Sequence, residues 1–166
     1  MKIFNLKLGY TIILSIFLIS CSQDDDMLID KTSTLTDVPV TYSPMEYQIL
    51  SLLNEHRGSV GLAVLEIINV VSKEAEGHTD YMIQDGKPSH DNFPDRYKYL
   101  VEKASATKVG ENVAYGYSTA QAVVTAWIKS SGHRQNLENT DYTHFGISTK
   151  QNAEGRNYFT NIFISR

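Results

Sequence analysis

Two histidines and one glutamate are the residues of this chain that best suit a reactive or metal-binding site: His90, Glu111 and His133. Two imidazoles and a carboxylate can hold a divalent ion, usually zinc, and leave a fourth position for water. Without a metal, Glu111 could orient an imidazole and stabilise its protonated form, and that histidine could act as a general base. The three residues lie far apart and no HExxH pair exists, so the sequence leaves both kinds of chemistry open.

Further polar residues border these three and are candidates for ligand binding: His78, Asn112 and His144. His78 falls on the apolar stripe of a predicted helix. That position favours a buried histidine with a hydrogen-bond partner over one that lines a functional cavity. His90 stands in a polar loop, where functional imidazoles are common. Ser130 and Ser131 lack a Gly-x-Ser-x-Gly elbow, so we interpret them as helix-terminal residues and not as nucleophiles.

The elements that must position these side chains are helical early in the chain and extended late, which predicts an α+β fold. Apolar periodicity and capping boxes predict helices, and β-branched and aromatic runs around a turn predict a hairpin. For the third helix, the predicted inner stripe is Tyr97, Leu100, Val101 and Ala104. Four helices are predicted: one from Ser43 to Gly58, one over 62–84, one that follows the polar loop 89–94, and one from Ser118 to Gly132. Three strands are predicted, over 113–115, 145–149 and 157–165.

The N-terminal residues predict export and lipid attachment. Residues 1–20 combine two lysines with an apolar run that is shorter than the roughly 20 residues of a membrane span. They end in a lipobox before Cys21, the only cysteine, so we expect a lipoprotein signal peptide (1–20) and an anchor to the membrane. Residues 21–42 form a predicted flexible tether, and 43–166 a single domain.

The charge of the chain bears on its partners and its location. The formal net charge is −4, and without the two signal-peptide lysines it becomes −6, which argues against nucleic acid as a partner. The run Ser-Gln-Asp-Asp-Asp after Cys21 resembles signals that send some Gram-negative lipoproteins to the cell surface, and a solvated spacer is the alternative. The expected location is therefore the outer membrane or the cell surface.

The segment from Gly110 to Ile147 resembles the CAP superfamily (cysteine-rich secretory proteins, antigen 5 and pathogenesis-related proteins), in particular its small bacterial SCP-like members. The matching motifs are Gly110-Glu111-Asn112, Val113-Ala114, Gly116-Tyr117-Ser118-Thr119, Trp127, Ser130, Gly132-His133-Arg134, Asn136 and Thr143-His144-Phe145-Gly146-Ile147. Weaker matches extend the resemblance to nearly all of the chain from Ser43 onward.

The resemblance implies an α-β-α sandwich with a mainly antiparallel sheet and a central cleft, in which His90, Glu111 and His133 converge and some relatives bind zinc. A second glutamate of many eukaryotic members is replaced by Ser130, and Asn161 stands where the late strand commonly carries glutamine. His144 is placed near the cleft. The disulfides of the family are missing.

No single reaction unites such proteins, and a fold does not define an activity. We therefore weigh three hypotheses. The first is a binding module whose cleft takes a small molecule, lipid, glycan or divalent metal. The second is a hydrolase of peptide or cell-envelope substrates. The third is a structural or adhesive surface protein, with another protein as its partner, in which the polar residues of the cleft only stabilise the fold. The missing nucleophile elbow and second acid favour binding over hydrolysis.

Overall fold

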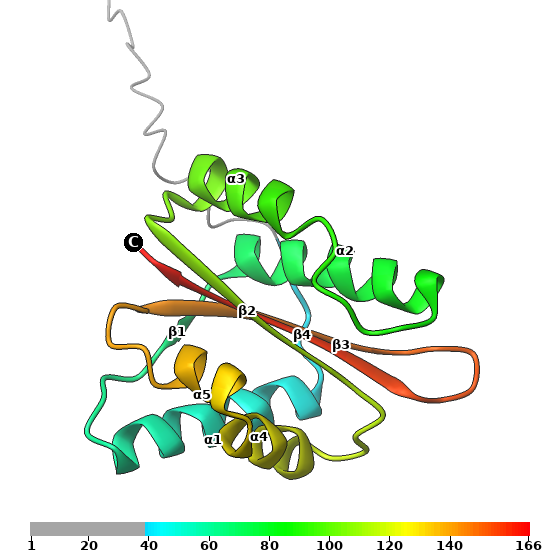
Figure 1. Ribbon diagram of the computed structural model, residues 1–166, viewed down its shortest axis with the longest axis horizontal. Helices are drawn as coiled ribbons and strands as arrows, with labels where there is room; N and C mark the ends of the chain where they lie inside the picture. The colour runs from blue at the N-terminus through cyan, green and yellow to red at the C-terminus, as the bar shows by residue number, and fades with distance from the viewer. Residues whose placement is uncertain (1–38) are drawn as a thin grey trace, which may run out of the picture.

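The computed structural model describes residues 39–166 (Figure 1). The predicted signal peptide, Cys21 and most of the tether lie outside the described residues. No helix within 39–166 has the length and apolar character needed to cross a membrane.

Five helices and four strands make up this part of the chain. The helices are α1 (Pro44–Ser59), α2 (Asn69–Asp85), α3 (Phe93–Ala104), α4 (Ala120–Lys129) and α5 (Ser131–Leu137). The strands are β1 (Glu66–Ile67), β2 (Lys108–Tyr115), β3 (His144–Gln151) and β4 (Asn157–Ser165).

The four strands form one sheet in the order β1-β3-β4-β2, so β2 is an edge strand. β3 and β4 form the predicted antiparallel hairpin, and β2 pairs antiparallel with β4. The short β1 runs parallel to β3. The sheet is therefore mainly antiparallel, as expected.

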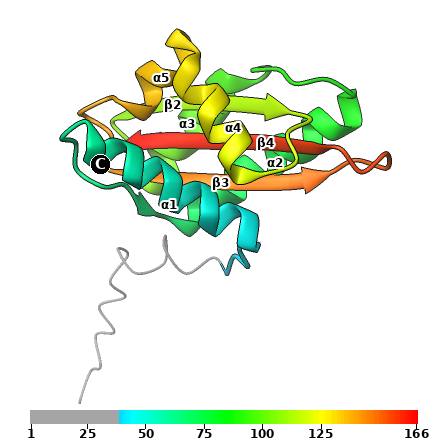
Figure 2. The same cartoon turned by 90° about the horizontal axis from the view of Figure 1, so that it is seen from below.

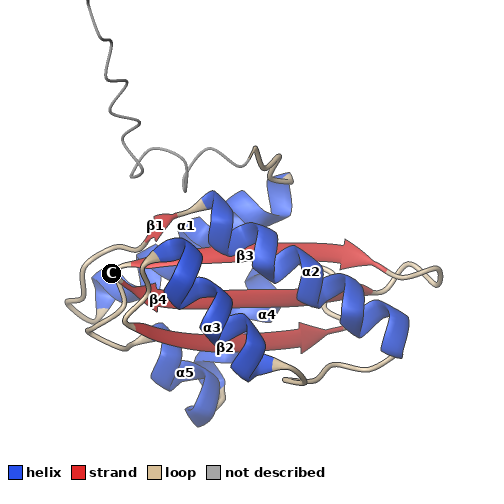
Figure 3. Cartoon of the chain, turned by 90° about the horizontal axis from the view of Figure 1, so that it is seen from above, coloured by secondary structure: helices blue, strands red, loops and turns tan. Residues whose placement is uncertain are grey.

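Helices cover both faces of the sheet, which confirms the α-β-α sandwich (Figure 1). α2 and α3 cover one face (Figure 3), and α1, α4 and α5 cover the other (Figure 2). Each layer has its own apolar core, because strand side chains alternate between the two faces. In β4, for example, Phe159 and Phe163 pack in the core of α1 and α4, whereas Ile162 and Ile164 pack against α2 and α3.

Several predicted element boundaries were wrong. The second helix begins at Asn69 and not near residue 62, because Glu66 and Ile67 pair with β3 instead of continuing a helix. Gly132 does not end a helix: α4 stops at Lys129, and an extended Ser130 leads directly into α5.

Three further details of the prediction also changed. The strand predicted over 113–115 runs from Lys108 to Tyr115 and so includes Glu111. Thr119, and not Ser118, caps α4, through a hydrogen bond from the backbone N–H of Ala122. On α3, Tyr97 and Val101 are exposed.

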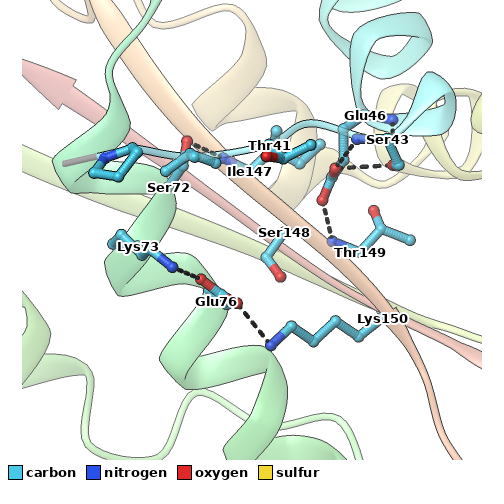
Figure 4. A pocket seen from close by; sticks show the side chains of 12 residues that line it. Thr41, Ser43, Glu46, Ser72, Lys73, Glu76, Ile147, Ser148, Thr149 and Lys150 are labelled. Atoms are coloured by element: carbon cyan, nitrogen blue, oxygen red, sulfur yellow. Dashed lines mark hydrogen bonds and ion pairs between the residues drawn. The ribbon is translucent and has the colours of Figure 1, made fainter. Parts of the chain in front are cut away.

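The capping box predicted at Ser43 is present, and it also connects α1 to the sheet. The Glu46 carboxylate accepts from the Ser43 backbone N–H at 2.7 Å and from the Thr149 backbone N–H, on the outer side of β3, also at 2.7 Å. Figure 4 shows this contact. It lies beside a hollow of about 380 Å³ at the edge of β3. In the same hollow, Glu76 of α2 pairs with Lys73 and Lys150.

Candidate functional site

Glu111 lies near the middle of the edge strand β2, and its side chain is directed to the layer of α2 and α3. The carboxylate is almost fully buried and accepts three hydrogen bonds from two side chains. His90 Nδ1 lies 2.8 Å from Oε1. Arg96 of α3 donates from Nε to Oε2 and from Nη2 to Oε1, each at 2.8 Å. Glu111 is therefore the shared acceptor of an imidazole and a guanidinium.

These partners keep Glu111 ionised in spite of its burial. Burial alone would raise the pKa of the carboxyl, but the hydrogen bonds from His90 and Arg96 and the Arg96 charge outweigh it, so the pKa of Glu111 is lowered. A carboxylate accepts but does not donate, so the proton of the 2.8 Å contact resides on His90 Nδ1. Glu111 thus fixes the orientation of the His90 ring.

His90 and His133 come from different layers and face one hollow of about 500 Å³. His90 precedes α3 and has an exposed side chain, whereas His133 belongs to α5 on the other face of the sheet. The two layers meet around the edge strand β2. Apart from the histidines, the lining is largely apolar and aromatic: Pro88, Ser89, Val113, Ala114, Tyr115, Tyr117, Ala126, Trp127 and Ser130. We call this hollow the cleft.

Asn112 holds the His133 side of the cleft. Because side chains alternate along a strand, Asn112 points to the face opposite that of Glu111. Its Nδ2 donates to the backbone carbonyl of His133 at 3.0 Å, and its Oδ1 accepts from Asn136 at 2.8 Å. Asn136 also donates to the backbone carbonyl of Glu111 at 3.1 Å. Adjacent residues of β2 therefore position the two histidines, one on each face.

Burial favours the neutral form of His133. Its pKa is lowered first by burial and second by the positive charge that His90 can carry. Trp127 forms part of the wall, where its Nε1 donates to the Val113 carbonyl at 3.2 Å. The cleft therefore combines imidazoles with a rigid aromatic wall.

His78 lies behind Glu111 and does not line the cleft. It is buried, its Nε2 lies 2.9 Å from the carbonyl oxygen of Ser89 and 3.7 Å from Glu111 Oε1, and its ring stacks on Tyr81. Burial is the main cause of its lowered pKa. The contact with Ser89 suits a neutral imidazole that supports the loop carrying His90.

His144 is separated from the other candidates. It begins β3, where its Nδ1 lies 2.8 Å from Thr143 Oγ1 and its Nε2 lies 3.8 Å from Glu66. It does not line the cleft. Its pKa is lowered by burial and by Arg166. The structure therefore brings His90 and Glu111 into contact and places His133 across the cleft, but leaves His144 outside.

The proposed zinc ligands do not fit a metal centre as they are arranged. Within residues 39–166, no group of three or more His, Cys, Asp or Glu side chains is placed to hold a metal ion. Glu111 already has a cationic partner on both oxygens. Sequence reasoning missed that partner, Arg96. The signal was available, because Arg96 falls on the same helical stripe as the buried Leu100 and Ala104.

Taken together, the fold and the cleft define a small α-β-α sandwich protein with two histidines and a buried carboxylate at a sheet edge. Residues 50–163 match the model of the cysteine-rich secretory protein (CAP) family, and the chain belongs to that family.

Among relatives, the uncharacterized protein YkwD of Bacillus subtilis (strain 168) is 31% identical over 140 residues, which are 82% of this chain and 53% of YkwD. The chain thus spans about half the length of that relative. Solved structures that share the fold include two bacterial proteins. One is an outer surface protein from Borrelia burgdorferi, with TM-score 0.68, 24% identity, and coverage of 76% of this chain and 96% of that chain. The other is an extracellular protein containing a SCP domain from Bacillus anthracis str. Ames, with TM-score 0.64, 27% identity, and coverage of 78% and 45%.

Proposed function

We propose that this CAP-domain protein is a binding module that takes a small, partly apolar ligand into the cleft. The observation that carries the proposal is the composition of the cleft: about 500 Å³ bounded by Tyr115, Tyr117 and Trp127, with His90 and His133 on its polar side. Ligand pockets commonly have roughly 300–1,000 Å³ and an apolar wall with a few polar groups that orient the ligand. The apolar part of the ligand would contact the aromatic wall, and a polar group would contact the imidazoles.

Ser130, three residues before His133 in the chain, lacks the partner that a catalytic nucleophile needs. Ser130 lines the cleft together with His133, but within the described residues no hydrogen bond joins its hydroxyl to an imidazole. Serine nucleophiles are activated by an adjacent base in hydrogen-bond contact. This arrangement supports binding over covalent catalysis.

A pair of alanines on α4 provides the test. Ala126 lines the cleft, whereas Ala122 lies one turn earlier on the same helix and is exposed. The purified protein is screened by calorimetry against small alcohols, phenols, fatty acids and short glycans. For any compound that binds, Ala126→Trp is expected to fill the cleft and lower affinity at least about tenfold, and Ala122→Trp to leave it within about twofold. Absence of saturable binding across the panel, or equal loss in both variants, contradicts the proposal.

A hydrolase is the second candidate, and the contact between His90 and Glu111 favours it. A carboxylate 2.8 Å from an imidazole nitrogen can orient a general base that activates water. Turnover of peptide and cell-envelope substrates by the wild type and by Glu111→Gln distinguishes the candidates. Activity that is present and falls at least about tenfold in Glu111→Gln supports this site; activity that is unchanged excludes it.

We further propose that the chain is exported and anchored through a lipid on Cys21, as the lipobox predicts. In support, similar solved structures include an outer surface protein and an extracellular protein. Metabolic labelling with a fatty acid, compared between the wild type and Cys21→Ser, tests the anchor. Equal label in the two proteins would disprove it.

A further inference from the structure

The guanidinium of Arg96 forms a bidentate ion pair with the Glu111 carboxylate. Nε contacts one carboxylate oxygen and Nη2 the other, both at 2.8 Å, and both side chains are buried. Two parallel charge-assisted hydrogen bonds make this one of the strongest pairings available to a carboxylate. Arg96 therefore neutralises Glu111 inside the protein, without any added ion.

Arg96 is also held in place by its own surroundings. Its Nη1 donates to the backbone carbonyl of Asp91 at 2.6 Å, and its guanidinium carbon lies 5.8 Å from the centre of the Phe93 ring. Its position on α3 places it on the same stripe as Leu100 and Ala104, which are completely or almost completely buried. The side chain is therefore fixed by contacts on three of its nitrogens and enclosed between α3 and the sheet.

A divalent ion bound to Glu111 would have to share the carboxylate with this fixed cation. Oε1 already accepts from both His90 and Arg96. Displacing Arg96 would leave a buried guanidinium without its counter-ion, which is strongly unfavourable. His90 is constrained as well, because its Nδ1 donates to Glu111 and only Nε2 remains for a metal. Two imidazoles are fewer protein ligands than the three that catalytic zinc sites use.

We propose that Arg96 is a built-in cation that replaces a divalent metal ion at this site. Glu111 is then the counter-ion of Arg96 and the acceptor that orients His90, and it is not a metal ligand. Arg96 acts as a positioning residue: it holds the carboxylate, and the carboxylate holds the imidazole. Arg96 has this role as the cation beside Glu111 whether or not the cleft binds an organic ligand.

Calorimetric titration with zinc chloride alone tests the proposal in the purified protein. Wild type is expected to bind zinc weakly through the two histidines or not at all, and Glu111→Gln to weaken any such binding by no more than the roughly 10–100-fold that the loss of a residue supporting His90 costs. A ligand that is removed usually costs well over the roughly 10–100-fold that supporting residues cost. Weakening of zinc binding by more than about 100-fold in Glu111→Gln would therefore show that Glu111 is a ligand and overturn the proposal.

Two substitutions of Arg96 add an independent prediction. Arg96→Met frees the carboxylate and is expected to bind zinc at least about tenfold tighter than wild type, whereas Arg96→Lys keeps a cation and is expected to remain within about threefold. Circular dichroism establishes that each variant is folded. A folded Arg96→Met variant with no gain would overturn the proposal. If Arg96→Met does not fold, the comparison of wild type with Glu111→Gln decides by itself.

Discussion

Substitution of Gly146 by alanine should strongly destabilise the protein, because helix α2 packs directly on the β3 backbone at this glycine. A Cβ at this position would lie 2.3 Å from the Ser72 backbone nitrogen, 2.4 Å from the Val71 carbonyl carbon and 2.8 Å from Val71 Cβ. The two closest atoms belong to the helix backbone, so no rotamer change relieves the clash. Ordinary contact requires the helix to move away by about 1 Å.

That movement has a further cost at the same place. The Ile147 backbone N–H donates to the Ser72 hydroxyl at 3.2 Å, and a shift of about 1 Å would break this buried hydrogen bond. Overpacking costs about 1–3 kcal/mol, and a lost buried hydrogen bond adds about 1 kcal/mol. We therefore expect Gly146→Ala to lower the free energy of unfolding by about 2–4 kcal/mol. At about 4 °C per kcal/mol, the melting temperature should fall by about 8–16 °C.

Gly77 on the same helix gives a matched control. An alanine Cβ at Gly77 meets nothing within 4 Å, and the residue lies inside α2 on its exposed side. Because glycine costs about 0.5–1 kcal/mol relative to alanine inside a helix, Gly77→Ala should stabilise the protein by that amount. Urea unfolding followed by circular dichroism measures both variants. A Gly146→Ala protein within about 0.5 kcal/mol of wild type would show that α2 does not pack this closely on β3.

Three further predictions concern buried or charged contacts. Arg57 donates four hydrogen bonds to backbone carbonyls, so Arg57→Met should cost about 3–5 kcal/mol in urea unfolding, and a cost below about 1 kcal/mol would contradict these contacts. Asn112→Ala should lower the free energy of unfolding by about 2 kcal/mol, because it removes the hydrogen bonds that hold the α5 backbone. It should also weaken the binding of any ligand in the cleft; unchanged affinity in calorimetry would show that Asn112 has only a structural role. Hydrogen bonds from Lys73 and Lys150 lower the pKa of Glu76 below its ordinary value of 4.5. The ionised Glu76 therefore stabilises the folded protein above pH 4.5, and this stabilisation is lost as the pH falls through the lowered pKa. The unfolding free energies of wild type and Glu76→Gln should differ by less than about 1 kcal/mol, and this difference should shrink only in acid.

Local sequence signals predicted the parts of the fold that depend on local physics. The Ser43 capping box, the hairpin of β3 and β4 and the apolar face of α4 all have short-range causes, and the structure contains each of them. The start of α2 was missed because Glu66 and Ile67 pair with residues almost eighty positions later. Periodicity in a window of the sequence carries no information about such a partner.

The candidate site shows the same division between local and long-range causes. The motif around Glu111 and His133 identified His133, which lines the cleft, and Glu111, which contacts His90 of the cleft, but His144, which belongs to the same motif, lies elsewhere. The sequence indicates which strand a residue belongs to. The site that the residue joins depends on where that strand lies in the sheet and on the face to which the side chain points. For His144 the strand decides: its pairing with Ile164 places it on the same face as Glu111, but it begins β3, which β4 separates from β2.

The buried arginines could have been recognised by one physical criterion that uses the sequence alone. Arg57 continues the stripe of Ile49 and Leu53 on α1, and Arg96 begins the stripe of Leu100 on α3. A guanidinium on a buried stripe requires acceptors that the rest of the chain must supply. Arg57 donates to backbone carbonyls of two loops and of the end of α5, and so it stabilises the contact between those segments and α1. Arg96 finds the one buried carboxylate of the motif, Glu111, and so it decides the charge of the site. The same stripe position thus gives a structural residue in one helix and a functional determinant in another, and the difference lies in the acceptor.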